Sequence, residues 1–246
     1  MGVQRDKDAV LGHPSYVWRF GQQRRLTLVD KYAPLRGKKI LDVGCGLGMY
    51  VEKFRQFSDQ VYGVDIEVDR IVEGGRRLPN LFAAAAETLP FADNCFDVLL
   101  LHEVLEHVAD DRQVVQEAYR VLRPGGRMVI FVPNRLYPFE THGIYWRGRY
   151  RFGNFPLVNY LPNRLREPLC PHVRTYTLKG LRRLLSNLEH RIIVQTQIYP
   201  GYDNIVARYP QLGFALRRIT YFLEETPLRI FGLSHFVVVE RPRPIQ

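Results

Sequence analysis

Short apolar runs alternate with amphipathic stretches between residues 38 and 134. The runs are strand-length and rich in β-branched and aromatic residues, whereas the stretches between them place apolar residues at helical spacing. The predicted strands are 40–42, 60–66, 80–86, 96–101 and 127–132. The predicted helices are 50–57, 68–77 and 110–122. This regular alternation predicts an α/β fold, with a parallel sheet covered by helices on both faces.

Further elements are predicted on either side of this segment. A helix over 15–32 has Ser15 as its N-cap and Pro34 just beyond its end. A capped helix, a strand and a last strand follow at 177–188, 191–198 and 235–240. Because 246 residues can bury one good core, we expect a single domain over 1–246. Its expected parts are an N-terminal helix (14–36), a core (38–134), an insertion (135–176) and the rest of the sheet (177–240).

Two segments show neither the helical nor the strand period of apolar residues. Residues 135–176 are aromatic, basic and proline-rich, and they are too long for an ordinary connection, so we interpret them as a lid over a binding site. Residues 202–232 are amphipathic, with apolar residues among arginines. This second insertion either roofs a pocket or faces lipid, and the roof is favoured because apolar helix faces most often bury themselves against their own core.

A glycine-rich turn follows the first predicted strand in the stretch ILDVGCGLGMY, residues 40–50. Gly44, Gly46 and Gly48 suit a tight turn into a helix, where the backbone can lie directly against a ligand. The spacing differs from the dinucleotide fingerprint G-x-G-x-x-G, because Met49 stands where its third glycine belongs. The turn therefore predicts a ligand at a helix amino terminus other than a dinucleotide.

The stretch D-x-G-x-G-x-G beginning at Asp42 resembles the first motif of class I S-adenosylmethionine-dependent methyltransferases, of the small-molecule "type 11"-like group. The blocks LPF…FD (89–97) and RVLRPGG (120–126) are similar to later motifs of the same family. The resemblance covers residues 38–134 and implies a Rossmann-like, doubly wound, seven-stranded sheet. That sheet is mostly parallel with an antiparallel last strand. It also implies S-adenosylmethionine as cofactor, S-adenosylhomocysteine as product and direct in-line displacement of the methyl group.

Several residues fall where the family binds its cofactor, beyond the carboxyl ends of the strands. Asp65, at the end of the second strand with Ile66, is expected to accept hydrogen bonds from ribose hydroxyls. Ala85 stands where the family commonly has an acidic residue, so the backbone of Ala86 and the side chain of Glu87 are expected to meet the adenine edge. His102 is expected at the methionine end. The predicted cofactor-binding set is Asp42, Gly44, Gly46, Gly48, Asp65, Ile66, Ala86, Glu87 and His102.

The run HEVLEH, residues 102–107, invites comparison with zinc motifs. A zinc-binding H-E-x-x-H places its histidines four residues apart, but His102 and His107 are five apart. The inverted H-x-x-E-H motif fails as well, because Glu103 stands where its first histidine belongs. The three cysteines share no metal-ligand spacing. We therefore predict no metal site and no disulfide.

Charge divides the chain unequally. Residues 1–134 hold 18 basic and 18 acidic residues, so the whole net charge of +10 lies beyond them, and 135–191 alone carries +8. Such asymmetry favours an anionic partner. Arginines 147, 149, 151 and 174 are expected to bind carboxylate or phosphate, and the aromatic residues at 145, 146, 150 and 152 are expected to stack on an apolar group.

The main prediction is methyl transfer to a small, anionic or lipid-linked metabolite. His142, in the lid, is the candidate general base, and His172 is its rival. Two alternatives stay open: an RNA methyltransferase, because arginines interleaved with aromatic residues also suit RNA, and a non-catalytic regulator that binds the cofactor. No apolar run reaches the ~20 residues that span a bilayer, so we expect a cytoplasmic protein. Peripheral contact of the basic, aromatic half with the inner face of the membrane stays open, as does the oligomeric state.

Overall fold

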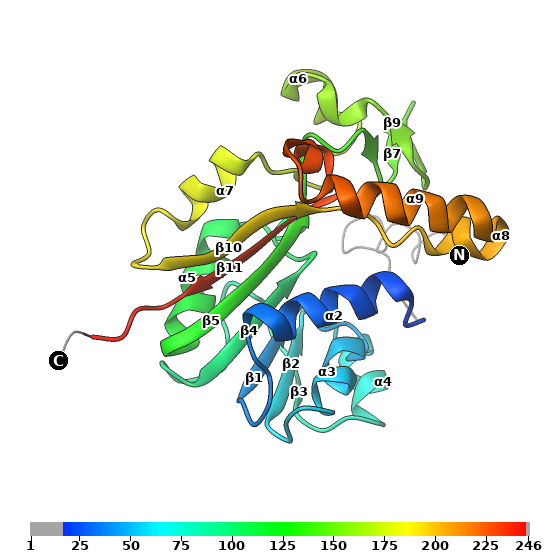
Figure 1. Ribbon diagram of the computed structural model, residues 1–246. Helices are drawn as coiled ribbons and strands as arrows, with labels where there is room; N and C mark the ends of the chain where they lie inside the picture. The colour runs from blue at the N-terminus through cyan, green and yellow to red at the C-terminus, as the bar shows by residue number, and fades with distance from the viewer. Residues whose placement is uncertain (1–16, 245–246) are drawn as a thin grey trace.

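A seven-stranded sheet organises the fold in the computed structural model, which describes residues 17–244 (Figure 1). The strand order is β10-β11-β5-β4-β1-β2-β3. The strands are β1 (Ile40–Val43), β2 (Val61–Asp65), β3 (Leu81–Ala83), β4 (Phe96–His102), β5 (Leu122–Pro133), β10 (Arg191–Ile198) and β11 (Ser234–Glu240). Strands β1 to β5 pair in parallel, whereas β11 is antiparallel to β5 and β10. The predicted fold class, including the antiparallel last strand, is confirmed.

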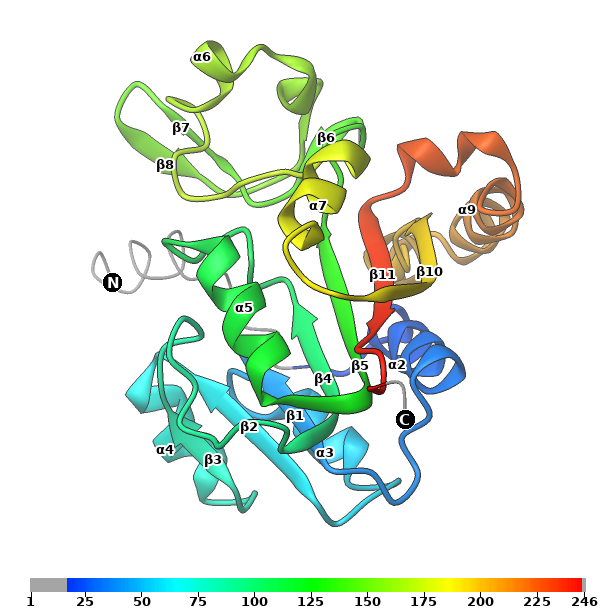
Figure 2. The ribbon, with the colours of Figure 1, turned by 90° about the vertical axis from the view of Figure 1, so that its left-hand side faces the viewer.

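Helices cover both faces of this sheet, because successive strand residues point to opposite sides. Leu41 and Val43 pack under α5 (Asp111–Val121) and α7 (Leu178–Leu185). Ile40 faces the other way, toward α2 (Phe20–Tyr32), α3 (Met49–Phe54) and α4 (Val68–Gly75). Figures 1 and 2 show α2 and α5 on opposite sides of the sheet. The buried runs of β1, β4 and β5 therefore supply two apolar cores.

Local signals explain most element boundaries. The carboxylate of Asp110 caps α5 by accepting hydrogen bonds from two backbone amides, and the hydroxyl of Thr177 caps α7 in the same way. Helix α2 begins at Phe20, and the predicted cap Ser15 lies outside the described residues. The predicted start of β5 at Arg127 is wrong. The strand begins at Leu122, which pairs with Phe96 of β4, and the amide of Gly125 and the carbonyl of Gly126 pair with the backbone of Arg241 at 2.7 and 3.0 Å.

The predicted lid, 135–176, is a small folded unit above the carboxyl ends of the strands (Figure 2). Its elements are β6 (Phe139–Glu140), β7 (Ile144–Trp146), β8 (Arg149–Arg151), β9 (Phe155–Pro156), η1 (Val158–Tyr160) and α6 (Asn163–Arg166). Strands β6 and β9 pair with each other, as do β7 and β8. Ile144, Cys170 and Val173 form its own apolar cluster. The strands are too short to show a period in the sequence.

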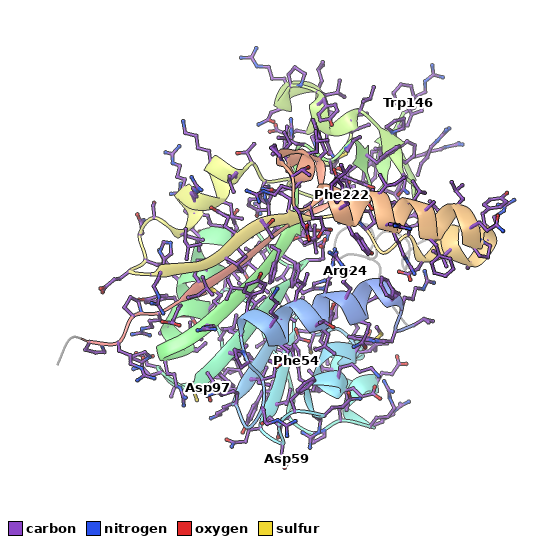
Figure 3. The ribbon with its side chains drawn as sticks, in the orientation of Figure 1. Arg24, Phe54, Asp59, Asp97, Trp146 and Phe222 are labelled. Atoms are coloured by element: carbon purple, nitrogen blue, oxygen red, sulfur yellow. The ribbon has the colours of Figure 1, made fainter. Side chains whose placement is uncertain are left out.

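The second insertion forms α8 (Asp203–Arg208), α9 (Pro210–Leu223) and η2 (Pro227–Phe231). It contacts α2, where Arg24 pairs with Glu224 and the guanidinium of Arg217 lies over the ring of Phe20. Other apolar side chains face outward, and Phe222 is 66% exposed (Figure 3). None of the helices within residues 17–244 is both long and apolar enough to cross a membrane.

Candidate functional site

A cavity of about 230 Å³ opens at the carboxyl ends of β1, β2 and β4. Gly44, Asp65, Ile66, Ala86 and Glu87, all predicted to bind the cofactor, line it. Val43, Val64 and Val104 supply apolar walls, and Glu103 and His107 supply a polar end. Five of the nine predicted residues thus line one cavity although they come from three separate segments of the chain, and their contact with the cofactor stays a prediction.

The glycine turn has the backbone that its sequence predicts. Gly44, Gly46 and Gly48 have φ of +74°, +56° and +83°, a region that residues with a Cβ rarely adopt. A Cβ at Gly44 would overlap the side chain of Val104, so packing requires this glycine. A Cβ at Gly46 would meet nothing within 4 Å, so open space lies in front of the backbone there. Gly46 is the point at which a ligand can approach the main chain.

Asp65 holds the turn against the end of β2. One of its carboxylate oxygens accepts a hydrogen bond from the amide of Gly46 at 2.8 Å, and the other accepts one from the amide of Glu67 at 2.9 Å. Each carboxylate oxygen can accept a further bond. The side chain is 7% exposed and lines the cavity. It is thus oriented by the protein and still able to bind hydroxyl groups of a ligand.

Asp42 and His102 lie away from this cavity's lining. Asp42 is 3% exposed behind the turn, where burial and the nearby Asp65 raise its pKa. His102 instead lines a second cavity of about 190 Å³ between α2 and residues 198–203. There its Nε2 contacts Arg25, and burial together with Arg25 lowers its pKa to about 3. Arg25 also contacts Glu103 at 3.3 Å, a role that no feature of the sequence indicated.

Glu87 is anchored to the chain that follows β4. Its Oε1 accepts a hydrogen bond from the amide of Ala109 at 3.2 Å, and its carbonyl accepts one from Gln113 at 3.3 Å. Ala86 lines the cavity beside it. The two residues therefore present main-chain and carboxylate groups at a defined position, as a hydrogen-bonding edge of a purine requires.

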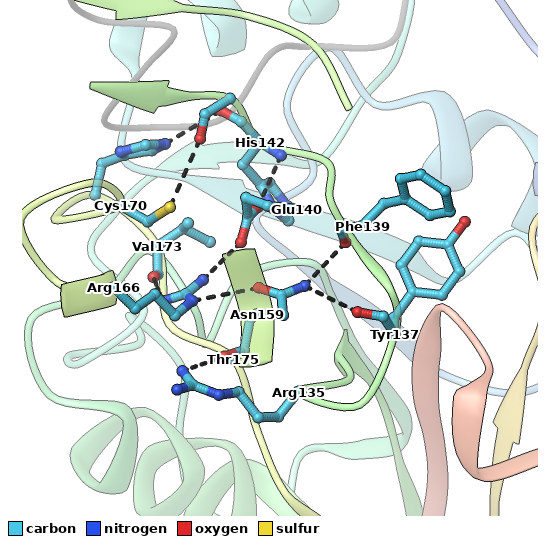
Figure 4. A network of polar contacts seen from close by, with 12 residues as sticks. Arg135, Tyr137, Phe139, Glu140, His142, Asn159, Arg166, Cys170, Val173 and Thr175 are labelled. Carbon is cyan, nitrogen blue, oxygen red and sulfur yellow. Dashed lines mark hydrogen bonds and ion pairs between the residues drawn. The ribbon is translucent and has the colours of Figure 1, made fainter. Parts of the chain in front are cut away.

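The lid brings His142 beside Glu103 and His107, which line the cavity, and Figure 4 shows the contacts that hold His142 within the lid. Glu140 accepts hydrogen bonds at one carboxylate oxygen from the amide and Nδ1 of His142, at 2.9 and 3.0 Å. Its other oxygen pairs with Arg166 at 2.6 Å, and both side chains are almost completely buried. The Nε2 of His142 lies 3.9 Å from the carboxylate of Glu103. His142 is therefore held by the lid and directed at the core of the fold.

The other lid residues predicted for the acceptor lie elsewhere. His172 uses its Nε2 to contact the carbonyl of His142 at 3.2 Å, and burial lowers its pKa. Arg147, Arg149 and Arg151 are exposed on the β7–β8 hairpin, beside Trp146 in Figure 3. Arg174 donates to the carbonyls of Val108 and Ala109. None of the four arginines lines this cavity, so their binding of an anionic acceptor stays a prediction.

Comparison with known proteins gives matches to methyltransferases. Residues 41–130 match the model of a methyltransferase domain family. Demethylmenaquinone methyltransferase of Renibacterium salmoninarum is 33% identical over 131 residues, 51% of this chain and 55% of that protein. Ubiquinone biosynthesis O-methyltransferase of Thiobacillus denitrificans is 36% identical over 118 residues, 45% of this chain and 51% of that protein. A solved S-adenosylmethionine-dependent methyltransferase from Mesorhizobium loti aligns with a TM-score of 0.62 at 18% identity, over 87% and 96% of the two chains.

The chain spans about half the length of the curated relatives it matches. The matched residues include the glycine turn, Asp65 and most of the cavity's lining, and the likeness to the solved structure shows the fold. Residues 41–130 thus match a methyltransferase domain family, as the sequence motifs predict, and the implied cofactor is S-adenosylmethionine.

Proposed function

We propose that the protein transfers a methyl group from S-adenosylmethionine to a small molecule bound under the lid. The observation that carries the proposal is the oriented carboxylate of Asp65, which lines the cavity and accepts a hydrogen bond from the amide of Gly46, where open space lies in front of the main chain. A nucleoside fits this combination, because its ribose offers two hydroxyl donors to a carboxylate. The apolar walls formed by Val43, Val64 and Val104 suit the flat faces of its base.

The residues present would divide the work of holding the cofactor. Asp65 would accept hydrogen bonds from the ribose, Ile66 would cover one face of the purine, and Ala86 with Glu87 would meet its polar edge. The bound cofactor supplies a methyl group on a positively charged sulfur, which a nucleophile can take up without a covalent enzyme intermediate. The protein's main contribution is then alignment of the two reactants, worth on the order of 7–11 kcal/mol in favourable cases.

The acceptor site is expected at the polar end of the cavity, where Glu103 and His107 face the interior. We retain His142 as the candidate group that takes the acceptor's proton. In support, Glu140 holds its Nδ1 and leaves Nε2 directed toward Glu103. Histidine oriented by a carboxylate is a common form of general base, and such a base contributes about 10²- to 10⁴-fold to the rate.

For the acceptor we propose an apolar, hydroxyl-bearing metabolite of the lipid-linked kind. The names of the two curated relatives connect those proteins with quinone biosynthesis. Around the lid and α9, this chain exposes large apolar side chains, including Trp146 at 47% and Phe222 at 66%. Such surfaces can receive an apolar tail that extends from the cavity.

Isothermal titration with S-adenosylhomocysteine tests cofactor binding directly. Asp65→Asn should weaken binding about 10- to 100-fold, because hydrogen bonds to a charged group are worth about 1.5–3 kcal/mol. Asp59→Asn is the matched control, since Asp59 is exposed at the opposite end of the sheet (Figure 3). Equal affinity of the two variants would contradict the assigned cavity.

Methyl transfer from radiolabelled S-adenosylmethionine to a cell extract, fractionated into lipid, RNA and water-soluble pools, then tests the reaction. Label in the lipid pool supports the proposal, and label in RNA favours the RNA alternative. Cofactor binding without any labelled product would instead indicate a non-catalytic regulator.

A further inference from the structure

Glu106 is a buried carboxylate that lies beside a second acidic side chain. It is 2% exposed, and no basic side chain among residues 17–244 donates a hydrogen bond to its oxygens. Its acidic neighbour is Glu103, and two adjacent buried carboxylates repel each other. Burial of an unpaired carboxylate costs several kcal/mol, so such a group takes up a proton or meets a cation.

Two histidines lie beside this carboxylate. One ligand atom from each of Glu106, His107 and His142 lies within 4.8 Å of the other two. Glu106 and His107 follow β4, whereas His142 comes from the lid, so only the folded chain brings the three together. The rings of His107 and His142 pack edge to face, with their centroids 5.6 Å apart.

Both histidines are oriented as metal-binding histidines are. The Nδ1 of His142 lies 3.0 Å from the carboxylate of Glu140, and the Nδ1 of His107 lies 3.3 Å from the carbonyl of His172. A metal-binding histidine almost always donates its second ring N–H to a carboxylate or a carbonyl, which fixes the other nitrogen as the ligand. Here each Nδ1 has such an acceptor, and Nε2 is the nitrogen left to bind.

A fourth possible ligand, a carboxylate oxygen, lies nearby. The carboxylate of Glu103 lies 3.9 Å from the Nε2 of His142, and Glu103 lines the cavity together with His107. The backbone of Glu103 has φ of +57°, a region that costs a residue with a Cβ about 1–3 kcal/mol and often marks functional sites. The cluster therefore borders the space proposed for the acceptor.

We propose that Glu106, His107 and His142 bind a divalent transition-metal ion at the polar end of the cavity, with Glu103 as a further ligand. Imidazole nitrogens together with carboxylate oxygens suit ions such as Mn²⁺ and Zn²⁺ better than Mg²⁺, which prefers oxygen alone. The ion would compensate the charge of Glu106 and would link the lid to the core. The sequence did not suggest this site because its third ligand, His142, lies outside the run HEVLEH.

The site also deepens the proposed function, on which this step rests. A metal ion beside the cavity would bind a hydroxyl oxygen of the acceptor and lower the pKa of that hydroxyl. The proton passes to water, and the new C–O bond forms as the C–S bond of the methyl donor breaks, leaving a neutral thioether. With the ion bound, His142 would be a metal ligand, so the ion would replace the general-base role proposed for His142, and the methylated atom would be an oxygen.

Direct metal binding tests the site without any methyl transfer. The full chain is dialysed against EDTA, freed of chelator and titrated with MnCl₂, while electron paramagnetic resonance measures free Mn²⁺. Zn²⁺ and Mg²⁺ are then compared by isothermal titration. We expect a single Mn²⁺ per chain, and weaker binding of Mg²⁺. Glu106→Gln and His142→Ala should each lower Mn²⁺ affinity more than about 100-fold, since residues that only orient a ligand are already worth about 10- to 100-fold.

Glu189→Gln and His190→Ala are the matched controls. They change the same residue types after α7 and should bind Mn²⁺ as the wild type does. Circular dichroism shows whether each variant folds. Glu106→Gln keeps the shape of the side chain, so it tests the site even if His142→Ala does not fold. Failure of the wild-type chain to bind Mn²⁺ or Zn²⁺, or unchanged affinity in folded Glu106→Gln, would overturn the metal site. Neither result would affect the cofactor titration, so the two proposals fail independently.

Discussion

Gly44 and Gly46 place different demands on an added methyl group, and replacing each by alanine separates packing from ligand binding. Their φ angles are +74° and +56°, and the left-handed conformation costs an L residue about 1–2 kcal/mol. An added Cβ at Gly44 would overlap Val104, whereas one at Gly46 meets nothing within 4 Å. The two substitutions therefore share the backbone strain and differ in what surrounds the new methyl group.

The expected losses of stability follow from these surroundings. In Gly46→Ala the strain is partly offset by a less flexible unfolded chain, worth about 0.4–1 kcal/mol, so the free energy of unfolding should fall by about 1 kcal/mol. Gly44→Ala adds overpacking against Val104, which typically costs about 1–3 kcal/mol. Its total loss should therefore be about 2–4 kcal/mol.

Urea unfolding and titration with S-adenosylhomocysteine measure the two effects. Gly46→Ala should unfold close to the wild type yet bind S-adenosylhomocysteine at least about tenfold more weakly, because its methyl group occupies the approach to the main chain. Gly44→Ala should unfold at a clearly lower urea concentration. In a double-mutant cycle, Val104→Ala should restore part of the stability lost by Gly44→Ala. Equal stability of the two single variants, or wild-type affinity in Gly46→Ala, would refute the assignment of Gly46 to the ligand side.

The remaining predictions concern the lid, the metal and the buried thiols. Glu140→Ala leaves Arg166 buried and unpaired, so urea unfolding should show a loss of about 3–5 kcal/mol, and a loss below about 1 kcal/mol would contradict the burial of this pair. Mn²⁺ at about 100 times its dissociation constant should add about 2.7 kcal/mol to the free energy of unfolding, an effect that EDTA should abolish. Burial raises the pKa of Cys45, and raises that of Cys170 to about 12, so neither should react with iodoacetamide at pH 8 in the native state. The half-buried Cys95 should react first, which mass spectrometry of the peptides would show.

Local pattern was sufficient for the central elements. Strand β10 has the predicted bounds, and the caps at Asp110 and Thr177 lie one residue before α5 and α7. These features depend on period and on side chains a few residues away, which a sequence displays directly. The predicted start of β5 was wrong because Leu122 pairs with Phe96 while Gly125 and Gly126 pair with Arg241, and nothing near Leu122 indicates partners so distant in the chain.

The cofactor side of the site was predictable for the same reason. In a parallel sheet, the residues that follow each strand meet at one edge, so the glycine turn, Asp65 and Glu87 had to converge once the strands were recognised. His102 shows the limit of this reasoning. It is the last residue of β4, one residue beyond the predicted strand, and its side chain lines the second cavity, because side chains alternate between faces along a strand.

By itself, the sequence was sufficient to predict the class of fold and the cofactor, and it indicated the edge of the sheet at which the predicted binding residues meet. Tertiary structure alone decided which side chains lie at the other, polar end of the cavity. It brought His142 from the lid to Glu106 and His107, turned Arg147, Arg149 and Arg151 outward and placed Arg25 beside Glu103. The physical reason is that the turn and strand ends are specified by short-range backbone geometry. The acceptor end depends instead on how a long insertion with short strands packs against the core, which no local period records.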